Sequence, residues 1–193
     1  MKEAVIIFDD FEENEEYLNN LEKLKQQIPN IKFTLFTIPA KTSSSFIQKL
    51  KKYEWIELCI HGYYHTQYEE VDISALHLLT AEGYKPIYKP PYWLISDKML
   101  SMLNSYKIKV VLHAFDTRDG IKHNWDLSEK EFGYRQSYNG NTLQFQPTTD
   151  DILITTGHIH NKESCYNNFS ISCANIINNN HKIKKYSLLS EVL

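Results

Sequence analysis

The chain has 193 residues, enough for one domain with a sizeable buried core, and 42% of them are hydrophobic. Its 21 basic and 24 acidic residues give a formal net charge of -3, which offers no positive surface for nucleic acid or an anionic membrane. We therefore expect a single catalytic domain over residues 1–193, with neither nucleic acid nor a membrane as a partner.

The cysteine pattern bears on the cellular compartment. Cys59, Cys165 and Cys173 are an odd number with no close pair, which favours reduced thiols over a disulfide framework. The N-terminal apolar run, Ala4 to Phe8, is too short for a secretory signal or a membrane span. We therefore expect a cytoplasmic protein. The sequence predicts no particular oligomeric state.

Short apolar runs and stretches with helical spacing alternate from residue 5 to residue 112, in the pattern βαβα. Strands are predicted at residues 5–8, 31–38, 55–60, 84–88 and 108–112. Helices are predicted at residues 17–28, 46–50, 74–82 and 99–103. The alternation implies a mostly parallel sheet with helical crossovers, so functional side chains are expected at the carboxyl ends of the strands.

From residue 115 to residue 149 the pattern gives way to polar, aromatic and turn-forming residues. Because this segment is long for a passive loop, we expect an ordered excursion beside the functional site. A strand at 152–156, a helix at 164–179 and a last strand at 183–189 are predicted to follow.

Two adjacent aspartates, Asp9 and Asp10, directly follow the first predicted strand. Neighbouring side chains on a strand point in different directions, so one carboxylate can hold a metal ion while the other handles a proton. The alternative is structural, because an Asp after a strand is a common turn former or helix N-cap. On this stretch alone the structural role is the commoner one.

The motif HGYYH places His61 and His65 four residues apart, just after the strand at 55–60. On a helical turn such residues share one face, where two imidazoles can bind one ion. Two imidazoles and one carboxylate form an open site like that of catalytic zinc, and the same ligand types occur in non-haem iron oxygenases. A second carboxylate beside the ligand favours hydrolysis, which needs a base for the attacking water.

Four motifs, FDDF, HGYYH, KPPYW and ILITTGHIHN, resemble in the same order those of the metal-dependent polysaccharide deacetylases. This family is also called the NodB-homology family or carbohydrate esterase family 4. The motifs lie between residues 8 and 161, most of the chain. The resemblance implies an α/β fold, a distorted (β/α) barrel of mostly parallel strands. It also implies a hydrolase that removes an acyl group, N-acetyl first, from a sugar or a related small amide.

The resemblance further implies a metal site. Asp9 corresponds to the family's catalytic base, and Asp10, His61 and His65 correspond to its metal ligands. One divalent ion is implied. Zinc is the first choice by ligand type, and other first-row metals are alternatives by availability.

Two more motifs of the family supply an oxyanion donor and an acid. The N–H of Tyr92 corresponds to the donor to the oxyanion, and His158 to the acid that protonates the departing amine. His160 competes for the acid's role, and we favour His158 because it lies nearer the strand end. Asp126, in HNWDL, is a candidate for orienting the acid.

The third motif departs from the family pattern. Lys89 stands where the family has an arginine that braces the base, and it offers a point charge without the two-pronged fork. Trp93 stands where the family has a glycine, and its ring would narrow the cleft or stack on a sugar. Tyr64 and Tyr92 are further candidates for contacting the substrate.

Two other functions remain open. One is allantoinase-like hydrolysis of a non-sugar C–N bond, and the other is a carbohydrate-binding domain without turnover. A binding domain needs no base beside a metal ion, so the retained acids and histidines argue against the second.

Overall fold

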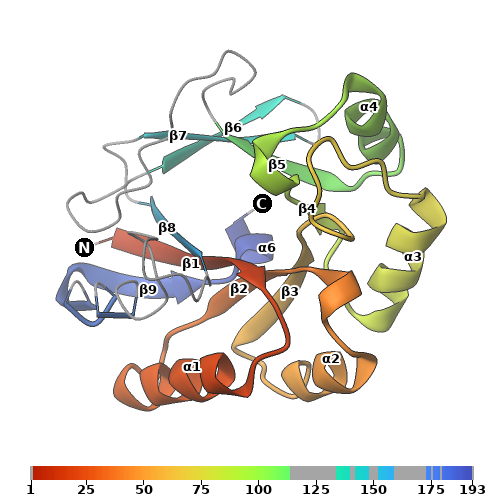
Figure 1. The fold of residues 1–193 in the computed structure, drawn as a ribbon. Helices are drawn as coiled ribbons and strands as arrows, with labels where there is room; N and C mark the ends of the chain where they lie inside the picture. The colour runs from red at the N-terminus through yellow and green to blue at the C-terminus, as the bar shows by residue number, and fades with distance from the viewer. Residues whose placement is uncertain are drawn as a thin grey trace.

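The computed structural model describes residues 2–113, 134–139, 142–147, 152–158, 173–174, 176–178 and 180–192. Within these ranges the chain forms a curled sheet of nine strands (Figure 1). The strands are β1 (Lys2–Phe11), β2 (Phe33–Thr37), β3 (Ile56–Ile60), β4 (Ile87–Tyr88), β5 (Lys109–His113), β6 (Tyr134–Asn139), β7 (Thr142–Pro147), β8 (Ile152–His158) and β9 (Ile183–Ser187).

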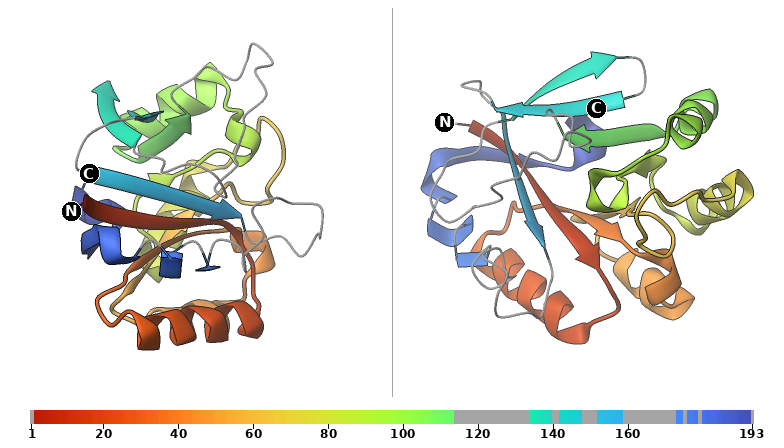
Figure 2. Two further views of the ribbon diagram at one scale, coloured as in Figure 1. Left: turned by 90° about the vertical axis from the view of Figure 1, so that its left-hand side faces the viewer. Right: turned by 45° about the horizontal axis from the view of Figure 1, so that its top comes forward.

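The strands lie in the order β6-β7-β5-β4-β3-β2-β1-β8, and β9 pairs with the first half of β1. Among the described strands every neighbouring pair is parallel except β6 and β7, which are antiparallel. Figure 2 shows β8 running alongside β1, and the curl of the sheet brings β8 towards β6. This confirms the predicted α/β class, a distorted barrel of mostly parallel strands.

Helices cover the outer side of the sheet, and one short helix lies inside its curl (Figure 1). The outer helices are α1 (Glu15–Gln27), α2 (Ser44–Leu50), α3 (Ile73–Glu82) and α4 (Asp97–Ser105). The short inner helix is α6 (Leu189–Val192), and single 3-10 turns occur at η1 (Pro39–Lys41), η2 (Pro91–Trp93) and η4 (Asn180–Lys182). No helix in the described ranges combines the length and the apolar character that a membrane crossing requires.

Each outer helix begins at a polar side chain that accepts a hydrogen bond from the first turn. The capping residues are Asn14, Ser43, Asp72 and Ser96. Asn14 caps α1, so the alternative role of Asp9 and Asp10 as helix caps is wrong. α3 ends at Gly83, whose φ of 113° is the left-handed conformation common after a helix.

Side chains along the strands alternate between two buried layers. Ile6, Phe8 and Leu58 belong to the layer between the sheet and its helices. Val5, Ile7, Phe36, Cys59, Ile87 and Val111 fill the inside of the curl together with Leu189 of α6. Burial on both faces explains why the strands read as nearly continuous apolar runs. Each fully buried large side chain contributes about 1.5–3 kcal/mol.

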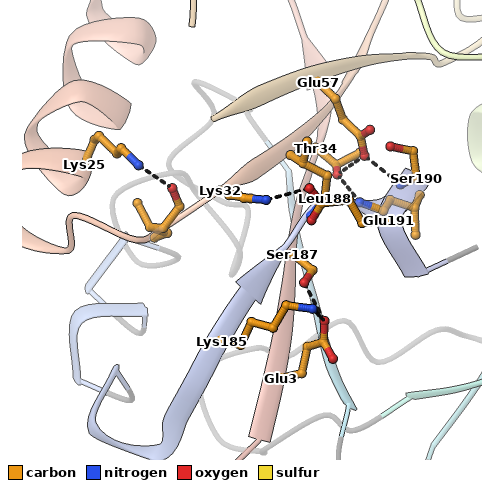
Figure 3. A network of polar contacts seen from close by, with 12 residues as sticks. Glu3, Lys25, Lys32, Thr34, Glu57, Lys185, Ser187, Leu188, Ser190 and Glu191 are labelled. Carbon is orange, nitrogen blue, oxygen red and sulfur yellow. Dashed lines mark hydrogen bonds and ion pairs between the residues drawn. The ribbon is translucent and has the colours of Figure 1, made fainter. Parts of the chain in front are cut away.

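The amino ends of the parallel strands are closed by the C-terminal segment (Figure 3). Thr34 donates to Oε1 of the buried Glu57 at 2.6 Å, and the N–H of Ser190 donates to the same oxygen at 3.1 Å. Glu3 accepts from Lys185 at 2.7 Å and from the Ser187 hydroxyl. These contacts fix β9 and α6 at the end of the barrel opposite Asp9 and Asp10.

The structure corrects several predicted boundaries. The strand predicted at 84–88 is reduced to Ile87–Tyr88, because Pro86 has no N–H to donate to the sheet. The predicted last strand ends at Ser187, and helix α6 follows. β6 and β7 lie within the segment 115–149, where no strands were predicted. Of the helix predicted at 164–179, only 173–174 and 176–178 lie within the described residues, and they are helical.

Candidate active site

Asp9 and Asp10 lie in a β-bulge near the end of β1. The register with β2 shifts between Phe8 and Phe11, so β1 carries one extra residue there. Asp10 has a φ of 57°, a left-handed conformation that costs a residue with a Cβ about 1–2 kcal/mol. The bulge directs the two carboxylates to different partners: Asp9 pairs with Lys89, and Asp10 faces two histidines. Both aspartates are buried.

A loop, not a helical turn, brings His61 and His65 together. No helix is assigned between the end of β3 and the start of α3. Gly62 has a φ of 65° and His65 a φ of 64°, and these two left-handed positions fold the chain back on itself. The two ring centroids are 4.8 Å apart. The predicted helical turn is therefore wrong, because the turn is made by positive-φ residues.

Asp10, His61 and His65 form a group whose possible ligand atoms all lie within 4.8 Å of one another. Oδ1 of Asp10 is 3.2 Å from Nε2 of His61 and 2.6 Å from Nε2 of His65. Asp10 and His61 are buried, and His65 is partly buried.

The hydrogen bonding of His61 determines what this group can bind. Nδ1 of His61 lies 3.0 Å from the carbonyl oxygen of Lys89. Because a carbonyl only accepts, Nδ1 carries the proton, and Nε2 of the neutral ring is an acceptor. That nitrogen faces a carboxylate oxygen of Asp10, which is also an acceptor. A cation between the two atoms, or a second proton on the ring, removes the conflict.

The residues present fit a divalent first-row cation. Two imidazole nitrogens and one carboxylate oxygen are ligand types of catalytic zinc sites, and they leave positions for water and substrate. A cation held by this group would lie beside the buried carboxylate of Asp10, and its charge would offset the cost of burying that carboxylate.

Lys89 holds Asp9 from the end of β4. Its ammonium donates to Oδ2 of Asp9, and both side chains are almost fully buried. The ammonium also lies 5.5 Å from the centroid of the Phe36 ring, beneath the site. Burial lowers the pKa of Lys89, and the charge of Asp9 opposes this shift. The ion pair therefore fixes the carboxylate in place.

Glu69 is a residue of the site that the sequence did not identify. It is buried, and its carboxylate accepts from the backbone N–H groups of Tyr63, Tyr64, His65 and Thr66. In the sequence, Glu69 is marked as a site residue only by being an acid four positions after His65. The adjacent Glu70 is exposed and pairs with Lys98, so sequence alone does not distinguish the two acids.

Three aromatic residues are candidates for contacting a substrate. Tyr92, in η2, has a φ of 54° and a side chain that is 53% exposed, and its ring centroid is 5.0 Å from that of His65. Tyr64 is 65% exposed and packs edge-on against Tyr63. The side chain of Trp93 lies outside the described residues.

The backbone of the predicted acid, His158, lies at the end of β8. His158 is the last residue of β8 and lies in register with Asp9 of β1. The side chain of His158 lies outside the described residues, as do His160 and Asp126 entirely.

No protein-family model matches the sequence, and no curated protein matches it. Solved structures do match. A peptidoglycan N-acetylglucosamine deacetylase is 20% identical with a TM-score of 0.59, over 98% of this chain and 86% of that one. A family 4 acetyl xylan esterase from Clostridium thermocellum, solved with a cobalt ion, is 13% identical with a TM-score of 0.59, over 99% of this chain and 90% of that one.

A CE4 family pseudoenzyme from Bacillus anthracis has the same TM-score, 0.59, at 13% identity, over 98% of this chain and 64% of that one. The chain therefore has the fold of the carbohydrate esterase family 4 deacetylases. The predicted resemblance to the polysaccharide deacetylase family is confirmed for the fold.

Proposed function

We propose that this protein is a metal-dependent hydrolase that removes an acyl group, N-acetyl first, from a sugar or a related small amide. The observation that carries the proposal is the separation of Asp9 from Asp10. One carboxylate faces two imidazole nitrogens, an arrangement that a cation can occupy, while its neighbour is held apart by Lys89. The fold shared with a peptidoglycan N-acetylglucosamine deacetylase supports the reaction class.

Asp10, His61 and His65 are proposed to hold one divalent ion. When bound, such an ion polarises an acyl carbonyl and lowers the pKa of a coordinated water. Zinc is the first choice by ligand type, and cobalt, present in the acetyl xylan esterase structure, is an alternative. The hydrogen bond from His61 Nδ1 to the Lys89 carbonyl orients one of the three ligands.

Asp9 is proposed as the base that takes a proton from the attacking water. Lys89 touches Asp9 and acts through it, so we assign it as a positioning residue and not as a catalytic one. Because a lysine presents one charged nitrogen, it fixes Asp9 at a single oxygen. The second oxygen belongs to the same buried carboxylate and is the one proposed to accept the proton.

The N–H of Tyr92 is proposed to donate to the oxyanion that forms when water attacks the carbonyl. Tyr92 lies in the turn η2, which begins at Pro91 directly after the extended residue Pro90, and its own φ is left-handed. His158 is proposed to give a proton to the departing amine. Its register with Asp9 supports the assignment, and His160 and Asp126 remain candidates for its supporting partners.

A sugar substrate is favoured by the exposed aromatic side chains. Tyr92 and Tyr64 are both more than half exposed, and exposed aromatic rings can stack on a sugar ring. Trp93 is proposed as a further contact on the strength of its sequence position. Allantoinase-like cleavage of a non-sugar C–N bond is the second candidate reaction.

The proposal is tested by measuring amine release from N-acetylated sugars and cyclic amides, and acetate release from acetylated xylan fragments, with zinc or cobalt supplied. Release from the sugars with a metal requirement is the expected result. Metal binding without release from any substrate would instead support a binding domain, as the shared fold of a CE4 pseudoenzyme allows. The cytoplasmic location stays a prediction.

A further inference from the structure

We propose that Glu69 is a positioning residue that holds the loop of the metal ligand His65. The inference rests on the proposed metal site. Oε1 of Glu69 accepts from the N–H groups of Tyr63 at 2.9 Å and Tyr64 at 2.7 Å. Oε2 accepts from those of His65 at 3.1 Å and Thr66 at 3.4 Å. One buried carboxylate thus binds four consecutive backbone amides, including that of a proposed ligand.

Four consecutive N–H groups do not point to one place in a strand, where successive groups alternate. Here the chain wraps around the carboxylate, with one left-handed residue, Gly62, directly before the four amides and another, His65, among them. A backbone concavity of this kind is an anion-binding arrangement, and here its anion is a side chain of the same loop. The negative charge of Glu69 therefore favours the bent form of the loop.

Gly62 completes this arrangement. A Cβ at this position would lie 2.6 Å from Cγ of Pro91 and closer still to Oε2 of Glu69. Glycine thus leaves room for both the carboxylate and the Pro91 ring at the place where a Cβ would lie. Pro91 belongs to η2, the turn that also carries Tyr92. Glu69 and Pro91 therefore set the loop of His65 against the turn proposed to bind the oxyanion.

The contacts of Glu69 and Pro91 control the position of His65. His65 sits in a left-handed conformation that residues with a Cβ rarely adopt, and its Nε2 reaches Asp10 from that conformation. If the loop relaxes to an ordinary backbone conformation, the ring leaves the group while His61, fixed by β3 and the Lys89 carbonyl, stays. Loss of Glu69 is therefore expected to weaken metal binding without removing a ligand.

The test compares Glu69→Gln and Glu69→Asp with wild type. Gln keeps the size but places an NH2 donor against two backbone donors, while Asp keeps the charge but is one methylene shorter. Two glutamates serve as controls: Glu70→Gln alters the exposed neighbour, and Glu57→Gln alters a buried, hydrogen-bonded carboxylate at the other end of the barrel.

Two quantities are measured on variants that keep the wild-type circular dichroism spectrum. The first is amide hydrogen exchange of residues 63–66 in the metal-free protein. The second is the dissociation constant for Co2+ or Zn2+, with the visible spectrum of the Co2+ form reporting its ligand geometry. We expect Glu69→Gln to speed exchange at residues 63–66 and to raise the metal dissociation constant about 10–100-fold, the usual effect of losing an outer-shell partner.

Glu69→Asp is expected to give intermediate values, and both controls are expected to stay within about twofold of wild type in metal affinity, well below that outer-shell effect. Protected amides and wild-type affinity in Glu69→Gln would overturn the inference. So would an equal loss of affinity in Glu57→Gln, which would reveal a general loss of stability. A wild-type protein that binds no metal would instead overturn the proposed function, and hydrogen exchange alone would then decide whether Glu69 holds the loop.

Discussion

Oδ1 of Asp10 lies 2.6 Å from Nε2 of His65, although two strands and two helices separate the residues in the chain. Both residues occupy the left-handed region, with φ values of 57° and 64°. Regular strand or helix geometry at either position would send the side chain elsewhere. Two local departures from regular structure thus create one contact, and the first prediction concerns what that contact binds.

Replacing His61 or His65 by alanine is expected to weaken Zn2+ binding by more than about a hundredfold, because even outer-shell partners are worth about 10–100-fold. Competition with a chromophoric chelator measures the dissociation constants. His77→Ala, an exposed histidine on α3, is the matched control and should bind as wild type does. Unchanged affinity in both site variants would rule out this ligand set.

Asp9 and Asp10 should separate by role. Asp9→Asn is expected to keep the ion and to lose turnover by roughly a hundredfold to ten-thousandfold, the range typical of a general base. Asp10→Ala should lose both the ion and turnover. Metal content and single-turnover rates measured on the same preparations distinguish the two. If Asp9→Asn empties the site and Asp10→Ala leaves it filled, the two roles are exchanged.

The sequence was sufficient for the parts of the site that depend on strand ends. Asp9 and His61 follow buried apolar runs, and the carboxyl ends of neighbouring parallel strands meet at one edge of the sheet. Their approach was therefore predictable from periodicity alone. The same reasoning placed His158 just after the strand predicted at 152–156, and the structure extends that strand to His158 itself.

The sequence was insufficient where the backbone leaves regular geometry. The bulge at Asp10 and the left-handed turn at His65 have no glycine at the strained residue to signal them. Glu69 is recognisable only once the loop has folded around it. Helix α6 is four residues long, and its place is set by distant contacts with Thr34 and Glu57 and not by its own sequence pattern.

The buried ion pair gives a stability prediction. Lys89→Met leaves the buried carboxylate of Asp9 without its ammonium, and breaking such a pair typically costs about 3–5 kcal/mol of unfolding free energy. The double variant Asp9→Asn/Lys89→Met removes both charges and should recover most of that loss. Urea denaturation of the metal-free proteins at neutral pH measures both. Strictly additive losses would contradict direct coupling of the two residues.

The contact of Glu3 with the C-terminal segment predicts a dependence of stability on pH. Hydrogen bonds from Lys185 and Ser187 lower the pKa of Glu3 below its ordinary value of 4.5. A carboxyl with a lowered folded-state pKa stabilises the fold above its unfolded-state pKa. That contribution disappears as the pH falls through the folded-state value.

We therefore expect Glu3→Gln to lower the melting temperature by about 1–2 °C at pH 7, the scale of a partly exposed pair in a chain of this size. The difference from wild type should shrink as the pH falls below 4.5 and should vanish below the lowered folded-state pKa of Glu3. Thermal unfolding at several pH values measures it. Glu12→Gln, which breaks an exposed pair with Lys41 at the other end of β1, is the control. A difference that grows towards acid pH would contradict the assigned direction of the pKa shift.

The last prediction tests whether His158 supplies the proton to the leaving group. The nitrogen of an amide cannot leave as an anion, whereas p-nitrophenolate can. A general acid therefore matters for hydrolysis of an amide and hardly matters for hydrolysis of p-nitrophenyl acetate. His158→Ala should therefore lose roughly a hundredfold to ten-thousandfold in kcat on an N-acetylated sugar and little on p-nitrophenyl acetate, with its metal content unchanged. The register of His158 with Asp9 brings its backbone to the base and motivates this expectation. His160→Ala is the comparison, and it should lose much less activity on the N-acetylated sugar than His158→Ala. If His160→Ala instead loses activity on the N-acetylated sugar alone, the acid is His160. If His158→Ala loses activity equally on both substrates, His158 does not protonate the leaving group.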